Sequence, residues 1–338
     1  MASFSKFGND LYTGDVSINF IGRRKVWFAL AAVLIAVSIL VPALRGGYVF
    51  GIEFTGGSQF QIDSVEALSN PDTSADAQNL AIDTVVGVVE EAAPKVTVVG
   101  TNSLRIQTEQ LETEESNSVR DALAGAFNVD KDAVAASFVG PSWGADITGS
   151  ALRALIVFIA LAAIMMAIYF RTWKMSIAAM IALLHDIVIT AGVYGIFGFE
   201  ITPSAVIGFL TILGFSLYDT VVVFDKIREN TSEDGSESRR TFGESVNLAV
   251  NQTLVRSINT GVVAALPVAA ILFIGAYVLG AGTLRDIALA LFIGIVVGTY
   301  STIFIAAPLY AQFRQNEPDI LSRTKRLTVA RAADKGNK

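Results

Sequence analysis

The chain has 338 residues, of which 52% are hydrophobic and 17% charged, with a net charge of −6 and a mean hydropathy of +0.54. Soluble domains usually have about a quarter of their residues charged, so this composition excludes a purely soluble protein and indicates a membrane protein with a soluble part. The absence of cysteine excludes disulfides and thiolate metal sites.

Six apolar runs are long enough to cross a membrane as helices, which takes about 20 residues each. The predicted spans are residues 26–45, 150–171, 175–199, 201–224, 253–276 and 286–312. The first apolar run is longer than the core of a signal peptide, so we expect it to be an uncleaved anchor. Lys and Arg concentrate in the segments 1–25, 171–174, 225–252 and 313–338. Basic residues near span ends mark the cytoplasmic side, so both termini and the 225–252 loop are predicted to be cytoplasmic.

The long segment 46–149, between the first two spans, is predicted to be a separate extracytoplasmic domain. It holds sixteen acidic and four basic residues, a net charge of −12. Its pattern predicts strands and helices in the order β-α-β-β-α-β, at 48–54 with 58–65, 75–93, 95–99, 103–108, 113–127 and 133–139. This order is that of an α+β ferredoxin-like domain, in which two helices cover one antiparallel sheet. The segment contains no histidine, cysteine or nucleophile–base pair, so we do not expect an enzyme.

Asp219 is the only charged residue between positions 201 and 224. An ionised carboxylate inside hydrocarbon costs at least about 2.5–3.5 kcal/mol, so such residues usually mark ion pathways. Arg256 lies near the start of the next span, at a predicted similar depth. In one interpretation Asp219 alternates between protonated and ionised forms, and Arg256 stabilises the ionised form. In the other, the two form a static ion pair that only fixes helix packing.

His185 and Asp186 interrupt the third span, and His185 is the only histidine of the chain. Histidine titrates near neutral pH, which suits a proton relay through a water-lined path. The alternative is a hydrogen-bonded packing residue, since neighbouring residues on a helix point about 100° apart. Both interpretations place the pair toward the inside of the bundle.

Several segments resemble motifs of one family. Residues 51–57 read GIEFTGG, where that family has GIDFTGG, so Glu53 replaces the usual Asp. Residues 219–230 read DTVVVFDKIREN and closely resemble its fourth-helix motif. Its fifth-helix motif is matched at 251–254 and 256–260, and its sixth at 284–286 and 294–301. On these motifs the chain resembles the SecF proteins of the SecD/SecF family, within the resistance-nodulation-division (RND) superfamily.

The resemblance implies an RND-type bundle of six spans and carries over the roles of individual residues. It gives a role in proton coupling to Asp219 and Arg256, to which we add the intramembrane pair His185 and Asp186 as candidates. The remaining motif positions are expected to have structural roles: Gly51, Glu53, Thr55, Gly56, Gly57, Thr220, Asn259 and Thr260. Gly56-Gly57 is expected to form a tight bend where the chain enters the sheet.

The resemblance also implies a location and partners. Such a subunit lies in the bacterial inner (plasma) membrane and pairs with SecD. Together they use the proton motive force to help a preprotein through the SecYEG channel at the late, extracytoplasmic stage, after the SecA motor has acted. No cofactor, metal or nucleic acid is expected, and the basic tail is suited to anionic lipids.

Two other functions fit parts of the sequence. An RND-type exporter of small molecules or lipids would share the superfamily, although such exporters usually have twelve spans and two large outer loops. A scaffold without energy coupling would leave Asp219 and Arg256 as a structural pair. Coupling to protons and coupling to sodium ions are both compatible with these residues.

Overall fold

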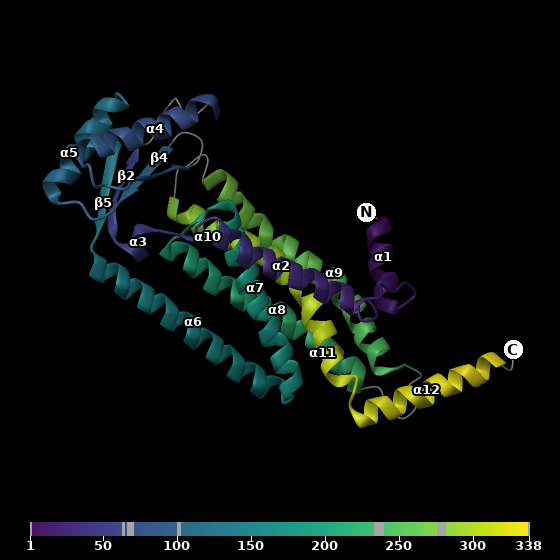
Figure 1. Ribbon diagram of the computed structural model, residues 1–338. Coiled ribbons are helices and arrows are strands. Elements are labelled where there is room, and N and C mark those ends of the chain that lie inside the picture. Colours follow the sequence, from purple (N-terminus) through teal and green to yellow (C-terminus); the bar gives the residue numbers. More distant parts are fainter. Residues whose placement is uncertain are drawn as a thin grey trace.

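The structure is a computed structural model that describes residues 2–62, 65, 71–99, 103–232, 240–275 and 282–336. It is a bundle of long helices with a small α+β domain at one end (Figure 1). In the described residues, six helices are long and apolar enough to cross a membrane, as predicted. Residues 100–102, between the strands predicted at 95–99 and 103–108, and the segment 233–239 lie outside the described residues.

The six membrane-length helices follow the predicted order, with short turns between several of them. They are α2 (Arg24–Leu44), α6 (Pro141–Phe170), α7 (Trp173–Phe197), α8 (Pro203–Ser232), α9 (Phe242–Ala270) and α10 (Gly282–Ser301). α9 continues through the π-helical turn η3 (Ile271–Gly275), and α10 continues through the π-helical turn η4 (Thr302–Ala306) into α11 (Ala307–Arg314). Helix α7 lies at the centre of the bundle and is the most buried of the six.

The segment 225–252, expected as a cytoplasmic loop, is largely helical in the structure. α8 runs to Ser232, and α9 already begins at Phe242. The Lys226–Glu229 ion pair (2.6 Å), three residues apart, supports the end of α8. Thr241 and Glu244 form a reciprocal capping box at the start of α9. These local signals extend both helices beyond the apolar runs from which the spans were predicted.

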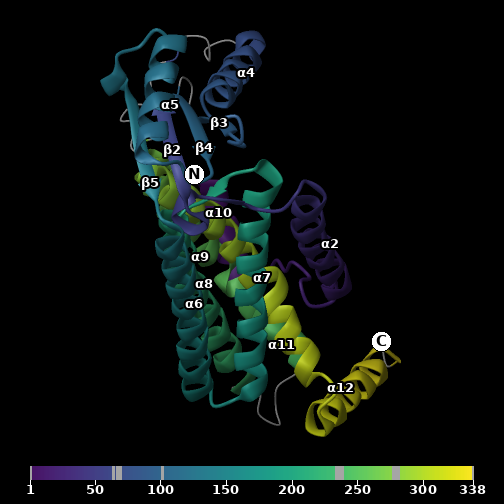
Figure 2. The ribbon, with the colours of Figure 1, turned by 60° about the vertical axis from the view of Figure 1, so that its left-hand side comes forward.

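Two further helices flank the membrane-length helices, α1 (Ala2–Thr13) and α12 (Pro318–Gly336). α12 leaves the bundle at the end opposite the α+β domain (Figures 1 and 2). The segment after α1 is tied to the start of α9, because Asn251 accepts a hydrogen bond from the Ile18 backbone N–H (2.8 Å). Both terminal segments therefore adjoin the first turns of α9.

The α+β domain consists of four strands and two helices. They are β2 (Gly57–Ile62), α4 (Pro71–Val88), β3 (Lys95–Val99), β4 (Ser103–Thr108), α5 (Thr113–Ala126) and β5 (Val134–Val139). The strands pair antiparallel in the order β3-β4-β2-β5. α4 and α5 lie on one face of this sheet (Figure 2). The apolar side chains of Phe60, Ile106 and Leu123 are fully buried between the sheet and the helices.

The entry to this domain differs from the prediction that 48–54 is extended. Only β1 (Val49–Phe50) is a strand, and it pairs in parallel with β6 (Glu200–Ile201); the short helix α3 (Ile52–Thr55) follows. Gly57 has φ +125°, and a Cβ there would lie 2.3 Å from the Thr108 carbonyl oxygen. The expected tight bend at Gly56-Gly57 is thus present, and it directly follows the single helical turn α3 rather than a strand.

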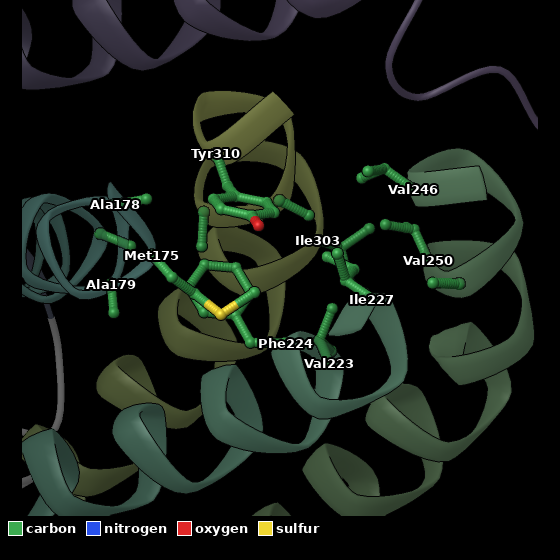
Figure 3. Packing of buried hydrophobic residues seen from close by; sticks show 14 of the residues in the cluster. Met175, Ala178, Ala179, Val223, Phe224, Ile227, Val246, Val250, Ile303 and Tyr310 are labelled. Atoms are coloured by element: carbon green, nitrogen blue, oxygen red, sulfur yellow. The ribbon is translucent and has the colours of Figure 1, made fainter. Parts of the chain in front are cut away.

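The helices pack through an apolar core at one end of the bundle and through small residues in its middle. Figure 3 shows Phe224 and Ile227 of α8 facing Tyr310 of α11, with Val246 and Val250 of α9 beside them. Farther along, α8 and α10 approach closely because Gly294 leaves no side chain; a Cβ there would lie 2.3 Å from Ile212. This close crossing of α8 and α10 brings together the polar side chains described next.

Candidate functional site

Asp219 lies near the middle of α8 and is buried inside the bundle, with only 4% of its surface exposed. Its Oδ1 accepts a hydrogen bond from the Ser257 hydroxyl of α9 at 2.9 Å. Its Oδ2 is buried and has no hydrogen-bond partner in the described part of the chain. The carboxylate is therefore held at one oxygen and left unsatisfied at the other, in surroundings where an unpaired charge is costly.

Arg256 does not contact Asp219 in this structure. Its side chain is exposed, and the described residues contain no salt bridge between the two groups. The reason is the rotation of α9: neighbouring residues point about 100° apart, and Ser257 is the one that faces α8. The predicted similar depth of the two residues did not determine which face of α9 meets Asp219.

Asp186 of α7 is at the centre of a second polar cluster and is 2% exposed. Its Oδ2 accepts hydrogen bonds from Ser216 of α8 (2.5 Å) and Ser301 of α10 (2.8 Å). Its Oδ1 lies 3.1 Å from Nδ1 of the adjacent His185. One carboxylate thus links three helices.

His185 extends this cluster toward α10. Its ring centroid lies 5.9 Å from that of Tyr300. The His185 Nε2 and the Tyr300 hydroxyl are both buried and have no hydrogen-bond partner in the described residues. Buried polar atoms are nearly always paired, so two unpaired ones side by side distinguish this place from ordinary packing.

The two clusters are joined along α8. Ser216, Asp219 and Thr220 have the spacing i, i+3, i+4, which places them on one face of the helix. The Thr220 hydroxyl lies 3.1 Å from that of Thr302, which follows Ser301 in the chain. A continuous stripe of buried polar side chains therefore runs from His185 and Asp186 to Asp219 and Ser257; we call it the polar stripe.

The polar stripe meets α10 where that helix passes into the π-helical turn η4. Pro308 follows in α11, and proline cannot donate the hydrogen bond that an α-helix requires. π-helical turns are rare and often occur at functional sites. The widened turn brings Ser301 and Thr302, on consecutive positions, into contact with α7 and α8 respectively.

The GIEFTGG motif lies outside the polar stripe, between the bundle and the α+β domain. The Gly51 backbone N–H donates to the Ile201 carbonyl at 3.0 Å, next to the β1–β6 pair. Beside it, Glu200 accepts hydrogen bonds from Arg105 and Gln107 of β4. The motif and Glu200 therefore form the joint between the bundle and the domain.

The structure thus places Asp219, Thr220, His185 and Asp186 along one polar stripe. It leaves two other motif residues outside it: Asn259 is exposed on α9, and Thr260 is half-buried. Reasoning from the sequence missed the four hydroxyl residues Ser216, Ser257, Ser301 and Thr302. Ser257 and Ser301 lie within the motifs quoted above, and Ser216 lies three residues before Asp219, but none of them was given a role. Within the described residues, no group of three or more acidic, histidine or cysteine side chains could hold a metal ion.

Comparison with known proteins gives a consistent family. The family model described as protein export membrane protein SecD/SecF, C-terminal, matches residues 118–316. The protein translocase subunit SecF of Streptomyces coelicolor is 43% identical over 98% of this chain and 86% of its own length. The SecF subunit of Mycobacterium tuberculosis is 40% identical over 96% of this chain and 73% of its own length.

A solved structure shares the fold. The crystal structure of SecDF from Thermus thermophilus, a translocon-associated membrane protein, superposes with a TM-score of 0.74 at 30% identity. The match covers 89% of this chain and 39% of the SecDF chain. The chain therefore spans about two-fifths of that longer protein.

Proposed function

The chain belongs to the SecD/SecF family of protein-export membrane proteins, and we propose that it acts as a SecF subunit in Sec-dependent protein translocation. It is a multi-pass membrane protein, since six helices are long and apolar enough to span a bilayer. The proposal is supported by relatives that match nearly the whole chain and carry the name of protein translocase subunits.

The partner of this subunit is a SecD protein. The Thermus thermophilus relative is a single chain named SecDF. It contains a region similar to this chain and a remainder that is longer than that region. A separate SecD chain would supply that remainder here. Together the two subunits assist a preprotein that leaves the SecYEG channel after SecA has pushed it.

The energy for this step comes from protons that bind and leave Asp219. The observation that carries this proposal is a carboxylate near the middle of α8 that is 4% exposed and hydrogen-bonded at only one oxygen. Protonation removes the cost of the buried charge, whereas the ionised form needs a stronger donor. Arg256 is adjacent to Ser257 on α9, so a rotation of α9 by about 100° moves Ser257 away from Asp219 and turns the Arg256 guanidinium toward it. Each proton that crosses the membrane field yields about 2.3 kcal/mol per 100 mV.

Asp186 and His185 form the second half of the proton path. The hydroxyl groups of the polar stripe lie along α8 and α10 beside both carboxylates, and hydroxyl groups both donate and accept hydrogen bonds. A proton that reaches Asp219 therefore has an exit along α8 and α10. The same hydroxyls hold α7, α8 and α10 together, so a change in charge alters the packing of the three helices.

The α+β domain converts this change into movement on the outer side. Its sheet order β3-β4-β2-β5 supports a ferredoxin-like domain, and the basic residues near the span ends support an extracytoplasmic position with both termini cytoplasmic. Glu200 directly precedes α8, and it binds Arg105 and Gln107 of the sheet. Movement of α8 is therefore transmitted to the domain through this joint.

Complementation in cells tests the role in translocation. Cells depleted of this chain should accumulate uncleaved secretory precursors, and expression of the intact chain with its SecD partner should clear them. Normal export in depleted cells would contradict the proposed role. Uptake of small molecules or lipids is the parallel readout, and a defect there alone would indicate an exporter.

A further inference from the structure

An apolar cavity of about 380 Å³ lies between α6, α7, α8 and the segment that leads into the α+β domain. In both views of the bundle α6 runs alongside α7 and α8 (Figures 1 and 2). Two threonines, Thr55 and Thr148, are the polar residues of the lining. The apolar lining includes Phe50, Phe54, Leu152, Ile187, Phe209 and Leu213. The proposed function assigns no role to this cavity.

The cavity begins near the middle of two membrane spans. Ile187 and Leu213, which line it, lie near the midpoints of the apolar spans 175–199 and 201–224. A span of about 20 apolar residues crosses the whole hydrocarbon core, so its midpoint lies near the centre of that core. At its other end the cavity reaches Ile201, the first residue of the second of these spans. The cavity therefore extends along the half of the membrane that is next to the α+β domain.

A charged residue marks the membrane surface on this side independently. Arg153 follows the lining residue Leu152 on α6 and is exposed. Its guanidinium donates back along the helix, to the Gly149 carbonyl at 3.1 Å and to the Ser150 hydroxyl at 3.2 Å. Arginines near the ends of spans extend toward the headgroups in this way. The end of the cavity near the α+β domain thus lies at headgroup level, about 15 Å from the centre of the hydrocarbon core.

The cavity is open to its surroundings near the α+β domain and closed at the end near Leu213. Leu152 is 56% exposed and Phe50 is 47% exposed, so both lie at the opening. Leu213 is only 1% exposed. Lipid around the bundle can therefore contact Leu213 only by entering the cavity.

The chemistry of the lining favours hydrocarbon as the occupant. The Thr55 hydroxyl donates within its own segment, to the carbonyls of Gly51 (3.3 Å) and Gly56 (3.1 Å). The Thr148 hydroxyl donates to the Gly144 carbonyl at 2.8 Å, and no charged residue lines the cavity. A polar ligand or a peptide backbone would bring hydrogen-bonding groups that this lining leaves unsatisfied, which is costly. Hydrocarbon brings none.

The size of the cavity excludes a helix of a partner protein. A volume of 380 Å³ spread over a length of about 15 Å gives a width of about 6 Å, whereas a helix with its side chains is about 10 Å wide. A hydrocarbon chain fits such a long and narrow space. Apolar cavities exclude water and bind hydrocarbon ligands.

We propose that this cavity binds one acyl chain of a phospholipid from the half of the bilayer next to the α+β domain. The bound chain contacts Phe54 of the GIEFTGG motif on one side and Leu152 of α6 on the other. It supplies the dispersion contacts that an empty space between these side chains would lack. The lipid thereby becomes part of the joint between the bundle and the domain.

Photolabelling of the full-length chain in vesicles tests the proposal directly. The vesicles contain phosphatidylcholine with a photoreactive diazirine near the end of one acyl chain. After irradiation, labelled residues are located by mass spectrometry, and label on Leu213 is compared with label on Leu161, which is 61% exposed on α6. We expect Leu213 to be labelled although it is buried, because a chain that fills the cavity places its end there.

Filling the cavity should remove this label. Ala151 lines the cavity, and Ala151→Phe should lower the labelling of Leu213 by about tenfold, since the ring and an acyl chain cannot occupy the same space. Ala154→Phe is the matched control: it makes the same change one turn later on α6, at an exposed position that does not line the cavity. It should leave the label on Leu213 unchanged. Ala151→Leu is a smaller substitution, used if Ala151→Phe does not fold, and it should lower the label partly.

Three results would overturn the proposal. The first is the absence of label on Leu213 when Leu161 is labelled. The second is equal labelling of Leu213 in the filled variant and in Ala154→Phe. The third is loss of the label when SecD is present in the same vesicles, which would show that side chains of the partner fill the cavity. The measurement uses neither a gradient nor a preprotein, so its failure would leave the proposed role of Asp219 untouched.

Discussion

The Ser257 hydroxyl of α9 lies 2.9 Å from the Asp219 carboxylate of α8, while the neighbouring Arg256 is exposed. The buried Asp219 carboxylate therefore has a neutral hydroxyl as its hydrogen-bond donor, and the charged donor Arg256 is the preceding residue of α9. A weak donor tolerates both protonated and ionised carboxyl groups, since a serine hydroxyl can either donate or accept. A guanidinium only donates and favours the ionised form. The arrangement is therefore suited to the protonated half of a coupling cycle.

Ser257→Ala should impair coupling without preventing assembly. The substitution removes the only hydrogen bond that the described structure gives to the Asp219 carboxylate. Hydrogen bonds to charged groups contribute about 1.5–3 kcal/mol, so gradient-dependent translocation in vesicles should fall by about tenfold. Ser257→Thr keeps the hydroxyl and should retain most activity.

Thr253→Ala is the control for this prediction. Thr253 lies one turn earlier on α9, and its hydroxyl donates only to backbone carbonyls of its own helix. Its removal should leave the translocation rate nearly unchanged. Equal losses for Thr253→Ala and Ser257→Ala would show that the effect comes from general damage to α9.

Asp186→Asn should weaken the contact between α7, α8 and α10 and slow coupling. The amide keeps one acceptor oxygen for Ser216 and Ser301 but cannot bind and release a proton. A structural role alone predicts a lower melting midpoint with normal gradient stimulation. The relay predicts reduced stimulation even in a folded complex, measured as the ratio of translocation rates with and without the gradient.

Ser301→Ala separates these two effects further. It removes one of the two serine donors to Asp186 and leaves its carboxylate able to titrate. The melting midpoint should fall slightly, while gradient stimulation should persist at a reduced level. Complete loss of stimulation in Ser301→Ala, with full stimulation in Asp186→Asn, would contradict the path through Asp186.

Charge reversal at the joint should disconnect the α+β domain from the bundle. Arg105 and Glu200 form a salt bridge that is largely buried, since their side chains are only 15% and 14% exposed. Arg105→Glu places two carboxylates together and should destabilise this joint by about 3–5 kcal/mol. The double variant Arg105→Glu, Glu200→Arg restores opposite charges and should recover both stability and translocation.

Distance measurement shows whether the joint transmits movement. The chain has no cysteine, so spin labels can be attached at two introduced cysteines. One is placed in β5, and the other in the last turns of α6, at the end of that helix away from the α+β domain. The distance distribution should broaden in Arg105→Glu and narrow again in the double variant. Unchanged distributions in all three proteins would show that other contacts fix the domain.

Acid should release the segment that begins α12. Glu317 accepts hydrogen bonds from Arg314 (2.9 Å) and from Lys174 of α7 (2.9 Å). The hydrogen bond from Arg314, with a further one from Lys174, lowers the pKa of the Glu317 carboxyl, against the opposing effect of burial. A lowered pKa means that this stabilisation is complete above the ordinary value near 4.5 and is lost as the pH falls through the folded-state pKa.

Glu317→Gln tests this pH dependence. Because the carboxylate is 27% exposed, we expect the original chain to exceed the variant in stability by only about 1 kcal/mol at pH 7. Between pH 7 and pH 3.5, the difference between the two melting midpoints should shrink once the pH falls below the ordinary pKa value of 4.5. A constant difference across that range would contradict the assignment.

Much of the fold could be predicted from hydrophobic patterns because the membrane imposes a length on each span. The patterns located all six helices, but they placed helix ends at the ends of apolar runs. α8 continues to Ser232 and α9 begins at Phe242 because ion pairs and a capping box extend them through polar sequence. Residues 52–54 were predicted to be extended, yet Gly51 and Gly56 on either side of α3 allow a single helical turn, whose Phe54 carbonyl packs against Gly144 of α6.

The position of the site residues along their helices could be predicted from the sequence, but the face that each helix turns toward its neighbours could not. A lone carboxylate in an apolar run identified Asp219, and an interrupted span identified His185 and Asp186. The residue that faces Asp219 depends on the angle at which α9 packs, and that angle follows from contacts along the whole bundle. Serine and threonine are common in membrane helices, so Ser216, Ser257, Ser301 and Thr302 could not be assigned to this site until α7, α8, α9 and α10 were placed together.

The most direct test of proton coupling is the dependence of translocation on the gradient in vesicles that carry Asp219→Asn together with SecD and SecYEG. Asp225→Asn is the matched control, since it makes the same change in the same helix at a half-buried position whose partner is Tyr169. We predict that Asp219→Asn assembles normally and abolishes the stimulation by the gradient, while Asp225→Asn retains it. Full stimulation in Asp219→Asn would contradict the account and leave Asp219 as a packing residue.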